Sequence, residues 1–430
     1  MIWLYIALVA IGILSIFSVT YREGENLTDG FFRMKADYGK QSLYFAISLV
    51  LGLFILLTDS KFFTATANIW YATGIFVLLL VFPFHTEVKG TNSIIRFGGF
   101  QLQPAELCKI SVNLALAKYL SRIETDFTKT RSQLIAAAIV VIPAIITIAQ
   151  KETGLALVFF AFFLVMFREG LPAGYLIVGF SFAVLVVATL LVEMNTLAII
   201  LTSIALFAVY LLRRQIKRDR SLLVTIGFIW IVCVGIQRFA VPFLFSNVLQ
   251  KHQVERIFSL IGRENPYAAI NTVEDEDVKA RRQSTSDYNV RQSKIAIGSG
   301  GFAGRGFLKG TQTRFDFVPE QRTDFIFCTI GEGFGFIGST IFLALYLILL
   351  LRIVKIAERQ RSVFSRCYAY GVASVLFFHI TINICMTIGL APVIGIPLPF
   401  VSYGGTSLLT FSILLFILIR LDADRQMVLR

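Results

Sequence analysis

Long apolar runs constrain this chain more than any other feature of its sequence. About twelve runs are long enough, at or near the lower limit, to cross the hydrocarbon core of a bilayer as helices. Each is bounded by polar or basic residues, so the runs predict separate spans joined by loops. The runs cover residues 2–20, 41–58, 66–84, 104–120, 133–149, 154–167, 174–193, 196–212, 222–247, 325–351, 367–390 and 401–420.

The composition fits this interpretation. Of the 430 residues, 56% are hydrophobic and 16% are charged, more apolar surface than one soluble core of this size hides. The run 2–20 lacks the basic start and small-residue cleavage site of a signal peptide, so we expect it to be the first span. The prediction is one all-α polytopic membrane domain over 1–430 with about 10–12 spans.

Basic residues in the short loops predict the orientation. Lys and Arg cluster after the fourth, eighth and tenth runs, which places these loops and both termini in the cytoplasm. The loop 213–220 (RRQIKRDR) is then a cytoplasmic segment that touches anionic lipid. The segment 246–324 becomes one large extracytoplasmic loop, which is also rich in cations. Its part 271–286 is charged and without period, which is typical of a mobile insertion.

Charge and cysteine content exclude some functions. The five cysteines form no CxxC pair or His cluster, so neither a disulfide framework nor a metal site is predicted. The net charge of +13 comes from loops between spans. Membrane electrostatics and an anionic ligand account for it better than nucleic acid, for which we expect no role.

A glycine-rich, charged passage, 288–333, is the longest polar stretch with motif character. Its glycines allow tight turns, and Lys294, Arg305 and Lys309 offer donors suited to phosphate oxygens. Such turns also serve as hinges between helices, so the passage alone leaves both interpretations open.

Charged residues also lie where this passage re-enters the apolar region. Glu320, Arg322 and Asp324 sit in FVPEQRTDFIF, where charge is costly unless it is paired or used. The alternative is a structural network in which Thr323 or Asp324 caps the next helix.

Two further stretches combine polar groups with irregular backbone. Pro104 is placed to open a helix on which Glu106 and Lys109 share one face, either as a mutual ion pair or as groups in an outward cavity. The stretch 391–407 carries three prolines and three glycines at membrane depth and predicts lining of a substrate path, with Ser402 and Tyr403 as contacts. Within the apolar runs, Glu332, His379 and Asn383 are more typical of helix–helix hydrogen bonds than of catalysis.

These stretches together resemble one family. The blocks QLQPAELCK, NVRQSKIAIGSGGFAGRGFLKGTQ, FVPEQRTDFIF and GIPLPFVSYGGTSLL are similar to the signature blocks of the SEDS family (shape, elongation, division and sporulation), in the same order. The resemblance is nearest to its rod-shape, RodA-like branch.

The resemblance implies an activity and partners. Members of the family are peptidoglycan glycosyltransferases of the bacterial inner membrane that polymerise lipid II, a disaccharide-peptide on undecaprenyl pyrophosphate. They work with a class B penicillin-binding protein, a transpeptidase, among the membrane proteins of the elongation complex. An inverting transfer needs a carboxylate as general base and cations for the leaving pyrophosphate. The sequence leaves open whether a divalent cation, Mg²⁺ or Mn²⁺, assists.

The resemblance also implies binding residues. The expected substrate contacts in the matching blocks are Glu106, Lys109, Gln292, Ser293, Lys294, Arg305, Lys309, Glu320, Asp324, Ser402 and Tyr403.

The chain departs from the family pattern at the general base. The family's essential Asp lies six residues before the tyrosine that is Tyr288 here, and that position holds Arg282, after an insertion within 267–287. The remaining candidates are Asp287 and Asp277, which we rank level, followed by Asp275.

Other departures concern a cation, a proline and the span count. Asn92-Ser93-Ile94 replaces the family's Lys-Arg-Trp, which leaves Arg96 as a substitute cation, and Gln150-Lys151-Glu152-Thr153-Gly154 replaces Gln-Pro-Asp-Leu-Gly. An extra pair of spans within 174–247 explains why the chain has more than the ten spans usual in the family.

Two other functions stay open. A lipid-linked precursor transporter, or flippase, would use the same intramembrane charges and broken helices without covalent chemistry. A non-catalytic scaffold for a penicillin-binding protein would use the spans alone.

Overall fold

The computed structural model describes residues 1–21, 30–31, 36–84, 86–88, 91–97, 100–243, 245, 254 and 276–425. By its contacts the chain divides into two compact units. One unit comprises 1–171 and 289–430, and the other comprises 172–288.

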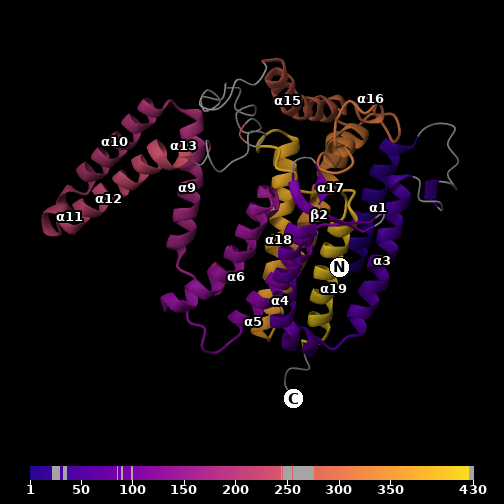
Figure 1. Cartoon of the computed structure of the whole chain (residues 1–430), viewed down its shortest axis with the longest axis horizontal. Helices are drawn as coiled ribbons and strands as arrows, with labels where there is room; N and C mark the ends of the chain where they lie inside the picture. The colour runs from indigo at the N-terminus through magenta and orange to yellow at the C-terminus, as the bar shows by residue number, and fades with distance from the viewer. Residues whose placement is uncertain are drawn as a thin grey trace. The chain divides into compact units, whose positions relative to one another are not determined.

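The larger unit is a helical bundle that brings the two ends of the sequence together (Figure 1). Helix α19 packs on α3, and α17 contacts α1, so the last helices of the chain contact the first ones. The helices of this unit are α1 (Ile2–Thr20), α3 (Asp37–Leu57), α4 (Ser60–Phe84), α5 (Pro104–Leu120), α6 (Thr130–Ala149), α7 (Thr153–Phe159), α8 (Phe162–Arg168), α16 (Thr311–Arg314), α17 (Ile326–Arg359), α18 (Val363–Thr387) and α19 (Gly405–Ala423), with the part of α15 (Glu276–Ser299) from Asn289 onward.

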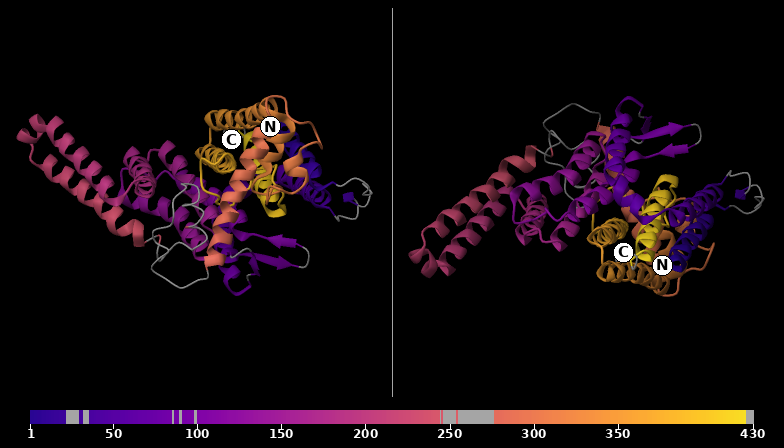
Figure 2. Two further views of the ribbon diagram at one scale, coloured as in Figure 1. Left: turned by 90° about the horizontal axis from the view of Figure 1, so that it is seen from above. Right: turned by 90° about the horizontal axis from the view of Figure 1, so that it is seen from below.

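The smaller unit contains apolar helices that expose most of their side chains. Helices α10 and α12 pack against each other along their length, as both views of Figure 2 show. Exposed apolar surface of this kind suits contact with lipid tails rather than water. Its elements are α9 (Ala173–Leu191), α10 (Met194–Leu211), α11 (Arg213–Arg218), α12 (Ser221–Gly235), the π-helical turn η1 (Ile236–Ala240) and α13 (Val241–Phe243).

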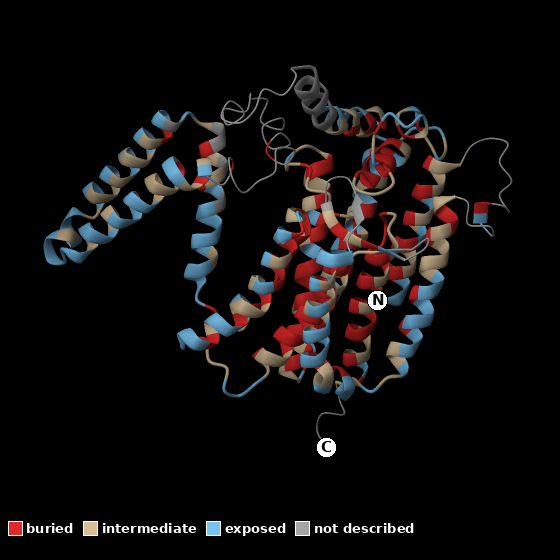
Figure 3. Ribbon diagram, in the orientation of Figure 1, coloured by how far each residue is buried: buried red, intermediate tan, exposed pale blue. Residues whose placement is uncertain are grey.

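Helix α5 is at the centre of the larger unit. It contacts α4, α6, α18 and α19, and nearly all of its residues are buried, as are large parts of α18 and α19 (Figure 3). Because protein rather than lipid surrounds it, α5 can carry Glu106, Lys109 and Asn113 at membrane depth.

The predicted all-helical membrane bundle is confirmed. Within the described residues, every predicted apolar run corresponds mainly to helix, although 154–167 is divided into α7 and α8, and 222–247 into α12, η1 and α13. Among the described residues, 8 helices are long and apolar enough to cross a membrane by themselves, and shorter apolar helices cover 153–168, 173–186 and 195–211. Helix α5, with 17 residues and three charged side chains, Glu106, Lys109 and Lys118, is not among these helices.

A small sheet precedes α5 and was not predicted from the sequence. Strands β1 (Thr86–Val88), β2 (Thr91–Phe97) and β3 (Phe100–Leu102) pair antiparallel in the order β1-β2-β3. Ile95 lies opposite Leu102 and Arg96 opposite Gln101. The predicted helix start at Pro104 is confirmed.

The glycine-rich passage packs against a kink in α17. Gly335 has φ 64°, and a Cβ there would lie 2.3 Å from the backbone nitrogen of Gly304. The amides of Arg305 and Gly306 donate to the carbonyl groups of residues 332 and 333. The glycines therefore allow two backbone segments to approach closely.

Two local expectations were wrong. Residues 276–286, whose charge pattern shows no helical period, form the first part of α15. The cap of α17 is not Thr323 or Asp324, because the helix begins at Ile326 after Phe325 and no side chain caps it. Asp275 and 271–274 lie outside the described residues.

Candidate active site

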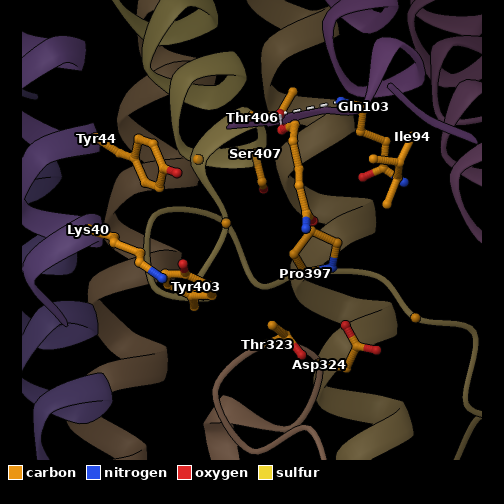
Figure 4. A pocket seen from close by; sticks show the side chains of 14 residues that line it. Lys40, Tyr44, Ile94, Gln103, Thr323, Asp324, Pro397, Tyr403, Thr406 and Ser407 are labelled. Carbon is orange, nitrogen blue, oxygen red and sulfur yellow. Dashed lines mark hydrogen bonds between the residues drawn. The ribbon is translucent and has the colours of Figure 1, made fainter. Parts of the chain in front are cut away.

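A polar cavity of about 340 Å³ lies at the end of the larger unit that carries the sheet (Figure 4). Four chain segments that are far apart in the sequence form its wall, the last of which runs from the loop before α19 into that helix. They contribute Lys40 and Tyr44 from α3; Ile94, Gln101 and Gln103 from the sheet and the residue before α5; Thr323 and Asp324; Gly395, Pro397, Tyr403 and Gly404 from the loop before α19; and Gly405, Thr406 and Ser407 from α19.

The irregular loop between α18 and α19 is held by buried polar side chains. Asn383 Nδ2 donates to the carbonyl oxygens of Asp324 at 2.9 Å and Ile396 at 2.7 Å. Ser402 Oγ donates to Thr323 O at 2.6 Å and accepts from Leu398 N at 2.8 Å. These hydrogen bonds take the place of the backbone hydrogen bonds of a helix. The polar backbone groups of this non-helical segment therefore have partners at membrane depth. The same bonds also fix Thr323 and Asp324 on the cavity wall.

Gln41 joins the same loop to α3. Its side-chain amide donates to Ser402 O and accepts from Gly404 N, both at 3.2 Å, and the residue is fully buried. The start of α19 is thereby tied to the first turns of α3.

A buried chain of polar groups lies beneath the cavity. Lys109 Nζ lies 2.6 Å from Glu106 Oε2 and 2.8 Å from His379 Nε2. His379 Nδ1 lies 3.1 Å from the carbonyl oxygen of Pro397, so the tautomer with its proton on Nδ1 satisfies both contacts. Glu106, Lys109 and His379 are all fully buried. The pair therefore supports the cavity floor through Pro397 and does not line it, which fits the ion-pair alternative.

Charged residues surround the start of α3. Arg322 Nη1 lies 2.8 Å from Asp37 Oδ2, whereas Lys40 Nζ is 3.8 Å from the other oxygen of Asp37. The latter distance is too long for a hydrogen bond. Arg322 is thus the main partner of Asp37, and the Lys40 ammonium remains beside the cavity.

Tyr403 adds a neutral hydroxyl to this wall. Its phenol hydroxyl can donate a hydrogen bond to a ligand in the cavity.

The sheet side of the cavity depends on Glu152. Ser93 Oγ donates to Glu152 Oε1 at 2.6 Å, and Gln103 Nε2 donates to the same oxygen at 3.4 Å. The backbone N–H of Asn92 donates to Gln150 O at 3.2 Å. The two segments that depart from the family pattern are therefore in direct contact.

The structure places three of the predicted binding residues at the cavity. Asp324 and Tyr403 line it, and the neighbouring Ser402 is buried in its supporting loop. Ser293 is buried and donates to Thr387 O at 2.9 Å. The others do not line it: Arg96, Lys294, Lys309 and Glu320 are exposed, Gln292 is half-buried, and Arg305 is bonded to Ser299 O and Thr311 Oγ1.

The predicted general bases cannot be placed on this wall. Asp277 and Asp287 belong to α15, but their side chains lie outside what the structure describes, as does the whole of Asp275. Their catalytic role stays a prediction.

Several residues that line the cavity were not predicted from the sequence. Among the described residues that line it, Lys40 is the one cation and Asp324 the one carboxylate. Lys40 lies in the polar first turn of α3, in DYGKQ. Its position directly before an apolar run is the sequence signal that could have indicated a charged residue near the membrane. Nothing in the sequence around Tyr44, Gln103 or Thr406 indicates that they converge.

Glu332 has a structural role. Its carboxylate is buried and accepts from the backbone N–H groups of Gln312 at 2.8 Å and Thr313 at 2.9 Å, and from the Thr313 hydroxyl at 2.8 Å. It thereby anchors α16 to α17, as its predicted non-catalytic role implies.

The fold and the cavity define a polytopic helical membrane protein whose polar site is closed by a broken loop between two spans. The chain matches the family described as FtsW/RodA/SpoVE cell cycle protein over residues 1–223 and 197–427. It therefore belongs to this family.

Individual relatives agree with the family match. The chain is 30% identical over 431 residues to the peptidoglycan glycosyltransferase RodA of Treponema pallidum (strain Nichols), covering 97% of this chain and 95% of that protein. It is 29% identical over 384 residues to the peptidoglycan glycosyltransferase MrdB of Escherichia coli (strain K12), covering 89% and 84%.

A solved structure has the same fold. The chain is similar, with a TM-score of 0.69 and 22% identity, to a chain solved under the description "Structural coordination of polymerization and crosslinking by a peptidoglycan synthase complex". The similarity covers 99% of this chain and 97% of that one.

Proposed function

We propose that this chain is a peptidoglycan glycosyltransferase that polymerises lipid II into glycan strands for cell-wall elongation. Family membership supports the reaction class, and one observation carries the site. Lys40 and Asp324 enter the same cavity from different walls (Figure 4). An inverting transfer needs such a pair, one group to take a proton from the acceptor hydroxyl and one to stabilise the departing pyrophosphate.

Asp324 is the candidate general base whose position is known. Asn383 holds its backbone carbonyl, and Ser402 holds the carbonyl of its neighbour Thr323. The backbone that carries this carboxylate is therefore fixed on the wall, and the side chain can reach the cavity without rearrangement of the loop. Asp287, Asp277 and Asp275 remain predicted alternatives from the adjoining segment.

The orientation and partner are part of this proposal. Lys118, Arg359 and Arg420 lie toward the bundle end opposite the cavity, which agrees with a cytoplasmic location of that end and of both termini. The cavity then faces the outer side of a bacterial inner membrane, where lipid-linked sugars are polymerised. We expect a class B penicillin-binding protein of the elongation complex as the crosslinking partner.

A divalent cation would act through the substrate. Because Asp324 is the one carboxylate among the described lining residues and is assigned to the acceptor hydroxyl, Mg²⁺ or Mn²⁺ would be held mainly by the pyrophosphate itself. Removal of metal with EDTA, followed by addition of each ion, measures this dependence on polymer yield.

Gel analysis of products from labelled lipid II tests the function. Purified full-length protein with its transpeptidase partner is expected to produce glycan polymer. Movement of lipid II across vesicles without polymer would favour a transporter, and the absence of both would favour a scaffold.

Variants of the carboxylates test the base. Asp324→Asn is expected to lower the polymerisation rate about 100-fold or more. Asp287→Asn, Asp277→Asn and the triple variant with Asp275→Asn examine the alternatives, and Glu124→Gln, an exposed acid in the loop after α5, serves as control. Full activity of the Asp324 variant, together with loss in the triple variant, would assign the base to the loop.

A further inference from the structure

The start of α19 forms part of the cavity wall, and its backbone donors point to a ligand. Helix α19 has 19 residues and begins at Gly405, with no side-chain cap. Within the described chain, no group accepts a hydrogen bond from the N–H groups of residues 405–407, whereas the N–H of Gly404 is taken by Gln41. The first N–H groups of a helix lack intrahelical partners and carry the positive end of its dipole.

Ser407 supplies an independent observation. Its relative exposure is 8%, it lines the cavity, and its side chain is drawn toward the cavity interior in Figure 4. The described chain offers its hydroxyl no hydrogen-bond partner, in contrast to Thr406, whose hydroxyl donates to Gln101 O at 2.8 Å. A hydroxyl that opens onto the cavity without a described protein partner is available to a ligand or to water.

Lys40 completes the group of donors. It lines the same cavity, and its nearest described acid, Asp37, is 3.8 Å from its Nζ and is hydrogen-bonded to Arg322. Gly405 allows the start of α19 to lie close to Tyr44 of α3, because a Cβ at this position would lie 2.8 Å from the Tyr44 ring. An ammonium, a hydroxyl and helix N-terminal amides together match the oxygens of a phosphate or pyrophosphate.

We propose that the N-terminus of α19 is the pyrophosphate site of this cavity, with the amides of Gly405, Thr406 and Ser407, the Ser407 hydroxyl and the Lys40 ammonium as donors. The identity of the lipid that carries the pyrophosphate rests on the proposed function, but the anion site rests on these contacts. Asp324, on another wall, is left for the acceptor hydroxyl. The glycine-rich passage does not supply the cradle, since its amides at Arg305 and Gly306 are bonded to α17.

Binding of undecaprenyl pyrophosphate to the full-length protein in nanodiscs tests the site. Ser407→Ala and Lys40→Gln are each expected to weaken binding about tenfold, the loss typical of one hydrogen bond to a charged group. Lys40→Arg, which keeps the charge, should restore most of the affinity. Ser412→Ala on the same helix and Lys61→Gln on α4 are matched controls whose binding should equal that of the wild type.

Competitors separate the sources of the phosphate. Inorganic pyrophosphate is expected to displace the lipid, whereas phosphatidylglycerol in the nanodisc should not. Equal competition by phosphatidylglycerol would overturn the proposal in favour of a general lipid-headgroup site. Wild-type affinity in both the Ser407 and Lys40 variants, with unchanged thermal midpoints, would overturn it as well.

The anion site and the polymerase function can be refuted independently of each other. If the wild type makes no polymer but binds undecaprenyl pyrophosphate through Ser407 and Lys40, the anion site stands and the polymerase assignment fails. If polymer forms normally in the wild type and in both variants, the anion site fails and the polymerase assignment stands.

Discussion

Lys109 and Glu106 form an ion pair at 2.6 Å in which neither residue is exposed to solvent. His379 provides a further contact to the ammonium, and Phe411 lies with its ring centroid 5.1 Å from Lys109 Nζ. Removal of one partner leaves an uncompensated charge in the centre of the bundle.

We predict that Glu106→Ala lowers the free energy of unfolding by about 3–5 kcal/mol, because the buried ammonium loses its counter-charge. The double variant Glu106→Leu, Lys109→Met should be less destabilised than Glu106→Ala, since no charge remains. Reversible unfolding in mixed micelles measures both. Glu358→Gln, which breaks the exposed pair with Arg168, is the control and should leave the midpoint unchanged; an equal loss there would contradict the argument.

The kink in α17 predicts opposite effects for two glycines. Gly335→Ala should lower the free energy of unfolding by at least about 2 kcal/mol, because its Cβ would meet the backbone of Gly304 and φ is positive. Gly298→Ala in α15, where nothing lies within 4 Å of the added Cβ, should leave stability unchanged or raise it by about 0.5 kcal/mol. Similar values for the two variants would show that the passage does not pack on the kink.

Alanine variants of Asn383 and Asn113 test whether Asn383 supports the cavity in addition to contributing to packing. Both are buried, but Asn383 bonds Asp324 O and Ile396 O, whereas Asn113 bonds Tyr368 O away from the cavity. Each Asn→Ala change should cost about 1–3 kcal/mol of stability. We expect Asn383→Ala also to reduce the polymerisation rate at a temperature where both variants are folded, and Asn113→Ala to keep it. Equal rates would argue against a positioning role for Asn383.

The hydrogen bond between Ser93 and Glu152 predicts that substitutions of these two residues have non-additive effects on the free energy of unfolding. Ser93→Ala and Glu152→Ala each remove the same 2.6 Å hydrogen bond, so the double variant should be less destabilised than the sum of the two single variants, by about 1 kcal/mol. A double-mutant cycle in unfolding and in apparent lipid II affinity measures this. The same cycle between Ser93 and the distant Ser412 should be additive, and additivity in both would contradict the coupling.

Much of the fold could be predicted from the sequence, because lipid imposes length and hydrophobicity on each span. Pro104 marked the start of α5, and the prolines and glycines of 391–407 marked the broken loop at the site. The cavity itself could not be predicted in detail. Lys40 and Ser407 are 367 positions apart, and periodicity does not determine which faces of α3 and α19 converge.

The glycine-rich passage shows a limit of motif reasoning. Glycines and cations predicted a phosphate cradle, yet the amides of Arg305 and Gly306 are used by the kinked helix α17. Glycine permits close approach of any partner, whether ligand or backbone, and the sequence does not distinguish between them. The chain's own departures at Ser93 and Glu152 became interpretable only when the structure brought them into contact.

The polarity of α5 has a consequence for how the protein is made. With Glu106, Lys109, Asn113 and Lys118 within 17 residues, this helix gains little from entering lipid alone. We expect it to be retained at the insertion machinery until α4 or α6 can cover its charges. Biogenesis would then depend on cooperation between neighbouring helices, so that a substitution on the α4 face that contacts α5 would appear as a failure of insertion before any effect on catalysis could be measured.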